Sequence, residues 1–568
     1  MHDLCITNAR VHDGSGAPPF EGGIAVSDGR IVEVGAEVGR GRTEVDAEGL
    51  ALAPGIIDSH THYDCQLTWD PYAVPSPALG VATVITGNCG FTIAPCHPEH
   101  RDLMLRHLES VEGMSIEALR AGTQWNFETF AEYLSALERS GAVPNVATYC
   151  GHSAIRTWAM GPEATERAAT DSELDAMTAA LRDALDAGAV GFSTTTVEAH
   201  NGADGAPMPS RLADDREMRA MARTLREAGK GVFLAALGSE HPVFGDREPM
   251  AFLEAMVEES GRPGIAPGIA HIPSMPESCF AEMDAVAAAQ ERGHCLYAQV
   301  PPSAITQTFT LVTPYPFEAL PAWRPAFPLY KDRAALAALY GDPDFRDAVK
   351  QDLVVPGPAK LFTDQWDHMV VEEAALEENR HFEERDVASL AAAEAVHPFD
   401  WFLDLGIAED FKTRFRAEMH NYDDEAVERL LAHPFSHPSL SDAGAHHSML
   451  CDAGFGLHMM GHWARDRASF PLEEAVRRLT SMPAEIYGIA DRGRLEPGCA
   501  ADLLLFDPAT VARGPLRVAH DLPTGARRVT RDGAGIHGVW VNGARIVDET
   551  GLIESEARPG VILREFAA

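Results

Sequence analysis

Two histidines one residue apart follow a short apolar run in the segment GIIDSHTHYD, residues 55–64. Residues i and i+2 of a β-strand project from the same face, so His60 and His62 can direct both rings at one point beyond the strand end. Neutral imidazole is a good zinc ligand. An isolated pair of this type is about as often an accident of a loop, but its position directly after a strand favours a metal site.

A second candidate ligand, Cys89, follows the next apolar run in ATVITGNCG, residues 82–90. Gly87 and Gly90 flank it and allow the sharp turn that would expose the sulfur at the strand end. A thiolate there is a competent zinc ligand. The alternative, a buried cysteine acting as a small apolar residue, is the commoner fate of a free cysteine.

The third candidate is Asp442 in HPSLSDAGAHH, residues 437–447. Its carboxylate can bind a metal, take a proton from water and return it to a leaving amine. A Ser-Asp pair by itself is more often a helix cap. Of the adjacent His446 and His447, we expect one to contact substrate and the other to be structural.

These residues require elements that bring several strand ends together. Between the two ends of the chain, short apolar runs alternate with longer amphipathic stretches such as DSELDAMTAALRDALDAG, residues 171–188. This alternation predicts parallel strands with crossover helices, and the number of units favours an α/β fold of the closed (β/α)8 TIM barrel type. The first fifty and last eighty residues instead show short strands with Gly and Asp-Gly turns.

Residues from about 300 to 435 interrupt the barrel pattern and indicate an insertion over one mouth of the barrel. Its first part, residues 301–330, is rich in proline and aromatic side chains. We expect this part to form an apolar pocket for an acyl chain or ring. Packing of the insertion itself is the competing explanation.

Composition limits the partners and the compartment. The chain has 568 residues with 85 acidic and 46 basic side chains, a formal net charge of −39, which disfavours nucleic acid and anionic membranes. The first residues show no basic segment followed by an apolar one, no long apolar stretch occurs in the sequence, and nine scattered cysteines fit a reducing compartment. We expect a cytoplasmic protein with a small-molecule substrate, and leave a homo-oligomer open.

Several motifs together resemble one family. PGIIDSHTHYD, GNCG, SDAGAH, RGRLEPGCAADLLLFD and VWVNGARIV are similar to the amidohydrolase superfamily, and GNCG to its branch of N-acyl-D-amino-acid deacylases. The resemblance covers nearly the whole chain. It implies a small β-sandwich built from residues 1–54 and 489–568, and a catalytic barrel over residues 55–488.

The resemblance also implies a metal site and an activity. By the family motif, one or two zinc ions would be surrounded by five residues: His60, His62, Cys89, His271 and Asp442. Asp442 would be the general acid and base in hydrolysis of a C–N amide bond by metal-activated water. The substrate would be a small N-acyl amino acid or a related N-acyl amine.

The chain departs from the branch at three positions. Ala236 stands where the branch has a metal-binding histidine, Gly238 where it has an arginine, and Pro273 where it has a basic residue. These changes put the second metal and the binding of a free carboxylate in doubt. Glu240 or His241 would have to compensate.

Two other functions therefore stay open. Hydrolysis of a cyclic amide, imide or lactone needs no recognition of a free carboxylate. The alternative from another class of protein is a catalytically silent barrel that only binds a ligand. Retention of five separated metal-type residues argues against silence.

Further polar residues at expected strand ends are candidates for substrate binding. They are His152 and Arg156 in CGHSAIRTW and Glu198 in TTTVEAHNG, together with His446. His200 is a similar candidate. A strand-end histidine satisfied by the backbone, or a solvated loop, explains these residues equally well.

Overall fold

The computed structural model describes residues 1–312, 314–318, 320–355, 360–447 and 449–567. Within these ranges, short parallel strands form a closed barrel, with β8 and β9 as two parts of one interrupted strand. The barrel strands are β6 (Ile56–Asp58), β7 (Val81–Thr86), β8 (Asn145–Thr148), β9 (Cys150–Gly151), β10 (Gly191–Thr195), β11 (Val232–Ala236), β12 (Gly264–Ala266), β13 (Leu296–Val300) and β17 (Ser436–Pro438).

The barrel closes just beyond its first and last strands. The His62 N–H donates to the Ala443 carbonyl at 2.7 Å, and Thr61 and Ala443 form a parallel bridge. Closure therefore brings the histidine pair against the loop that carries Asp442. The predicted (β/α)8 barrel is confirmed.

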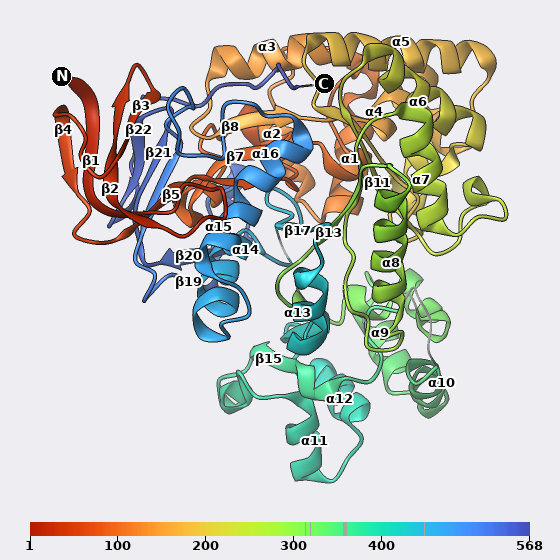
Figure 1. The fold of residues 1–568 in the computed structure, drawn as a ribbon. Helices are drawn as coiled ribbons and strands as arrows, with labels where there is room; N and C mark the ends of the chain where they lie inside the picture. The colour runs from red at the N-terminus through yellow and green to blue at the C-terminus, as the bar shows by residue number, and fades with distance from the viewer. Residues whose placement is uncertain (313, 319, 356–359, 448, 568) are drawn as a thin grey trace.

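Helices cover the outside of the barrel (Figure 1). In α6 (Asp215–Ala228), Asp214 accepts from the N–H of Glu217 at the start, and Gly229 ends the helix with φ 65°. Its apolar face is buried against the strands. The other helices around the barrel are α1 (Arg101–Glu112), α2 (Ile116–Gly122), α3 (Phe130–Ser140), α4 (His152–Met160), α5 (Asp171–Ala187), α7 (Pro249–Ser260), α8 (Ser278–Glu291), α13 (Asp424–Ala432), α14 (Phe455–His458), α15 (Leu472–Leu479) and α16 (Ser481–Tyr487).

Both ends of the chain build the second domain, the predicted β-sandwich. β18 pairs antiparallel with β5, so the red N-terminal and blue C-terminal strands lie side by side in Figure 1. Ile6, Val26, Leu503 and Trp540 are buried in its core. The strands are β1 (His2–Val11), β2 (Phe20–Ser27), β3 (Arg30–Gly35), β4 (Gly41–Asp46), β5 (Ala51–Pro54), β18 (Leu503–Phe506), β21 (Ile536–Val541), β22 (Ala544–Asp548) and β23 (Gly551–Leu552).

A hairpin of β19 (Ala512–Ala519) and β20 (Arg528–Ala534) leaves this sheet and contacts the barrel. Arg513 donates to Ser303 Oγ at 2.8 Å, and Arg531 donates to the Cys451 carbonyl at 2.7 Å. None of the described helices is long and apolar enough to cross a bilayer.

The insertion between β13 and α13 is a separate lobe below the barrel in Figure 1. Its strands pair in the order β14, β16, β15, all antiparallel. Its elements are β14 (Ile305–Phe309), α9 (Arg333–Tyr340), α10 (Pro343–Leu353), β15 (Met369–Glu373), α11 (Val387–Glu394), α12 (Pro398–Ala408) and β16 (Arg414–His420).

The prediction that residues 301–330 form an apolar substrate pocket is wrong for the described part of that segment. Phe309, Phe317 and Trp323 are almost fully buried in the insertion's own core. None of these residues lines the cavity at the barrel end. The insertion needs a core of its own because it is too large to be covered by the barrel alone, and these aromatic rings supply it.

Candidate metal centre and active site

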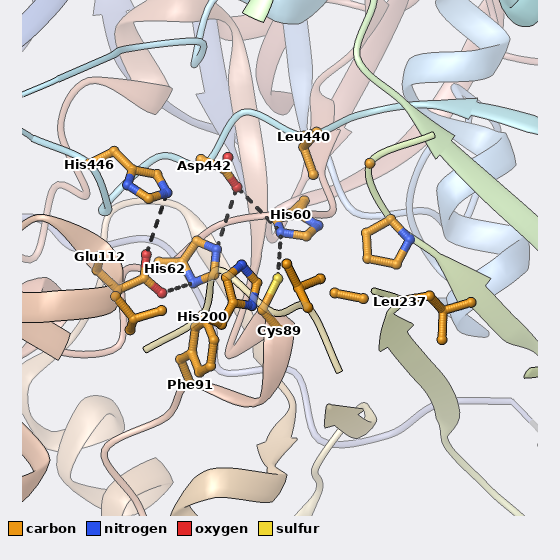
Figure 2. A pocket seen from close by; sticks show the side chains of 15 residues that line it. His60, His62, Cys89, Phe91, Glu112, His200, Leu237, Leu440, Asp442 and His446 are labelled. Carbon is orange, nitrogen blue, oxygen red and sulfur yellow. Dashed lines mark hydrogen bonds and ion pairs between the residues drawn. The ribbon is translucent and has the colours of Figure 1, made fainter. Parts of the chain in front are cut away.

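A cavity of about 230 Å³ opens at the carboxyl ends of the barrel strands. Figure 2 shows His60, His62, Cys89 and Asp442 directed towards one another at this cavity. Ligand atoms of His60, His62 and Cys89 all lie within 4.8 Å of one another. This is the arrangement that a metal ion with nitrogen and sulfur ligands requires.

His60 is held so that one ring nitrogen is free for the cluster. Its Nδ1 lies 2.8 Å from Gln299 Oε1, whose amide nitrogen donates to Ser59. Because an amide oxygen only accepts, the proton sits on Nδ1 and the lone pair of Nε2 points into the site. Nε2 lies 3.5 Å from Cys89 Sγ and 3.4 Å from Asp442 Oδ1.

His62 is oriented in the same way by a carboxylate. Its Nδ1 lies 3.0 Å from Glu112 Oε1, and its Nε2 lies 3.5 Å from Asp442 Oδ1. Both side chains of the His62–Glu112 pair are at most 5% exposed. A carboxylate behind a ligating histidine fixes the ring and raises its basicity.

Cys89 is presented by a turn in an uncommon conformation. Its φ is 55°, between Gly87 at 83° and Gly90 at 82°. A non-glycine residue in this region is sparsely populated and is kept there by its surroundings. Burial raises the pKa of the Cys89 thiol, but the neighbouring His60 and His62 outweigh burial and leave that pKa below its usual range.

Asp442 faces the cluster from the loop after β17. Its side chain is 21% exposed through the cavity, unlike the almost fully buried His60. Burial raises the pKa of the Asp442 carboxyl, but the contacts with His62 and His60 dominate and hold it well below its ordinary value. The group is therefore ionised near neutral pH.

The structure does not bring His271 to this cluster. β12 ends at Ala266, so Pro267 and Gly268 occupy the strand end and line the cavity. His271 lies further along the loop, where its N–H donates to Asn421 Oδ1 at 2.7 Å. Ala236 ends β11 and lines the cavity with a methyl group. The second ligand set is therefore not assembled among the described residues.

The two histidines after Asp442 lie in different surroundings. His446 lines the cavity, with Nε2 3.9 Å from Glu112 Oε2, whereas His447 is buried outside it and its carbonyl accepts from Val529. Glu198 does not line the cavity; it accepts from the N–H of Glu240 at 2.8 Å and links two loops. His241 bonds the Arg211 carbonyl and does not compensate for Ala236.

His152 and Arg156 were expected at the substrate, and the structure places them elsewhere. Both are fully buried between α4 and α6, where Glu217 accepts from Arg156 and lies 2.7 Å from His152 Nε2. Thr194 Oγ1 lies 2.8 Å from the other ring nitrogen. A buried guanidinium requires a paired carboxylate, so removal of Glu217 would leave an uncompensated charge inside the barrel wall.

Replacing Glu217 with glutamine is expected to destabilise the protein by about 3 kcal/mol or more, because the charge of Arg156 loses its buried partner. Urea denaturation measures this. Glu227→Gln on the same helix removes an exposed pair with Arg182 and should cost about 1 kcal/mol or less. Loss of turnover in Glu217→Gln with unchanged stability would instead place the triad in the active site.

The fold and site define a barrel protein with a candidate metal centre at its strand ends. The Amidohydrolase family matches residues 43–287 and 357–547, and the chain belongs to that family.

The similarity to deacylases extends over the whole chain. A D-aminoacylase of Alcaligenes xylosoxydans xylosoxydans is 29% identical over 574 residues, covering 100% of this chain and 98% of that protein. An N-acyl-D-aspartate deacylase of the same organism is 30% identical over 578 residues, covering 99% and 95%. A solved D-aminoacylase studied for its binuclear metal centre is 25% identical, with a TM-score of 0.67 and complete coverage of both chains.

Proposed function

We propose that the protein is a zinc-dependent hydrolase that cleaves the C–N amide bond of a small N-acyl amino acid or a related N-acyl amine. The observation that carries this proposal is the convergence of His60, His62 and Cys89 beside the ionised Asp442. Nitrogen and thiolate donors at this spacing suit zinc. Similarity to D-aminoacylase and N-acyl-D-aspartate deacylase supports the amide substrate.

The donor set supports one ion held by His60, His62 and Cys89, with Asp442 beside it. Such an ion, when bound, lowers the pKa of water and polarises a carbonyl. Asp442 Oδ1 would take the proton from the attacking water and deliver it to the leaving nitrogen. Gln299 and Glu112 would keep the two imidazoles in the required orientation.

Hydrolysis of a cyclic amide or imide is a second candidate. The cavity lining includes no lysine or arginine among the described residues, so nothing there requires a substrate with a free carboxylate. The same acid-base chemistry at Asp442 would open a ring.

The test is hydrolysis by zinc-loaded protein of N-acyl-D-amino acids, their amides and cyclic imides, followed by amine release or ring opening. Removal of metal with a chelator is expected to abolish turnover, and added zinc to restore it. Absence of hydrolysis of every substrate by protein that holds zinc would favour the silent binding barrel.

A further inference from the structure

The cavity has an uneven distribution of charge. Two carboxylates, Glu112 and Asp442, line it, and no lysine or arginine does so among the described residues. Burial lowers the pKa of His200, another lining residue, to about 4, so this ring is neutral near pH 7. The remaining wall is largely apolar, with Phe91 and Leu237 in view in Figure 2.

Of the two carboxylates in the cavity, Glu112 is the one whose negative charge a bound metal ion would not balance. It ends α1 and is only 3% exposed, with Oε1 against His62 and Oε2 3.9 Å from His446. With a divalent ion bound, the Cys89 thiolate and the Asp442 carboxylate would offset its two charges. Glu112 then adds one further negative charge to the cavity wall, with His446 as the neighbouring basic side chain there.

The neighbouring strand ends place no lysine or arginine in the cavity lining, as far as the structure describes the chain. A Cβ added at Gly238 would lie 2.6 Å from Glu198 Oε2 and 2.7 Å from the Thr196 carbonyl, so a longer side chain does not fit there as the loops stand. Beyond β12, Pro267 and Gly268 line the wall. A substrate carboxylate would meet no lysine or arginine in the described part of this wall.

We propose that the active site selects amides that carry no free carboxylate, and that Glu112 is the residue that excludes the carboxylate. This inference rests on the proposed function and narrows it to N-acyl amines, amino-acid amides and cyclic amides. A buried like charge disfavours an incoming anion strongly because little water screens the pair. Neutral or basic groups on the substrate meet no such penalty.

The experiment compares two substrates that differ only in this group, N-acetyl-D-methionine and N-acetyl-D-methioninamide. With zinc-loaded protein, kcat/KM for the amide is expected to exceed that for the acid by about a hundredfold. Glu112→Gln should reduce this ratio by about tenfold or more. Glu109→Gln, one turn earlier on α1 and outside the cavity lining, should leave the ratio unchanged.

The ratio separates exclusion from a merely structural role of Glu112. Weaker zinc binding through His62 would lower turnover of both substrates alike and leave their ratio unchanged. Equal turnover of the acid and the amide by the wild type, or a preference for the acid, would overturn the inference. If the wild type prefers the amide and Glu112→Gln does not reduce this preference, Glu112 is not the residue that excludes the carboxylate.

If the zinc-loaded protein hydrolyses neither of the two substrates and no cyclic imide, the proposed function is refuted instead. Calorimetric titration of the same pair into the zinc-loaded protein then still decides the selectivity. Charge exclusion would be supported if the wild type binds the amide more tightly than the acid and if Glu112→Gln makes this difference in affinity smaller. Equal or tighter binding of the acid would contradict it.

Discussion

Asp442→Asn is expected to lower kcat by about a hundredfold to ten-thousandfold, the usual contribution of a positioned general acid-base group. Asparagine has nearly the same shape, but its amide cannot accept the proton that the carboxylate takes. His60 and His62 keep Asp442 ionised in the wild type, so the full effect should be present at neutral pH. Steady-state kinetics on zinc-loaded protein measures it.

The matched control for this variant is Asp452→Asn. Asp452 lies further along the same segment and faces Arg513 and Arg531, at 3.9 and 3.8 Å, outside the cavity lining. Its replacement should leave kcat within a few-fold. Circular dichroism should show both variants folded. Wild-type-like hydrolysis by Asp442→Asn would remove this residue from the mechanism.

Cys89→Ala is expected to reduce zinc affinity by more than about a hundredfold, because loss of a direct ligand costs more than loss of a supporting residue. Wild-type protein purified without added metal should hold about one zinc ion per chain, since one cluster of donors is assembled. Plasma emission after dialysis measures both quantities.

Cys150→Ala provides the matched control for Cys89. Cys150 is fully buried on β9 and is not part of the donor cluster. Its replacement should leave zinc content unchanged. Unchanged zinc in Cys89→Ala would show that the sulfur is a buried packing group. Two zinc ions per wild-type chain would contradict a single donor set.

Local sequence signals marked the residues that meet at the centre of the site as candidates, and the family resemblance joined them into one set. His60, His62 and Cys89 stand just beyond apolar runs that become the barrel strands β6 and β7, and Asp442 follows the short strand β17 (Ser436–Pro438). Parallel strands bring their carboxyl ends to one face, so residues at these positions converge whatever their separation in sequence. Periodicity and turn residues carried that information.

Other residues of the site had weaker signals or none. Gln299 also lies near the carboxyl end of a barrel strand, β13, so the same rule could have found it. Glu112 ends a helix, and nothing in helical periodicity shows that its side chain turns back to His62. His200 stands in the loop after β10, where its environment depends on the packing of Phe91.

The sequence by itself predicted the barrel and the β-rich ends from patterns of strands, helices and turns, and it predicted the four central residues from local motifs together with the family resemblance. Only the tertiary structure decided the rest. It ended β12 before His271, sent His152 and Arg156 to a buried triad with Glu217, and placed Glu112 in the cavity. Those outcomes depend on contacts between distant segments, and such contacts leave no local periodic signal.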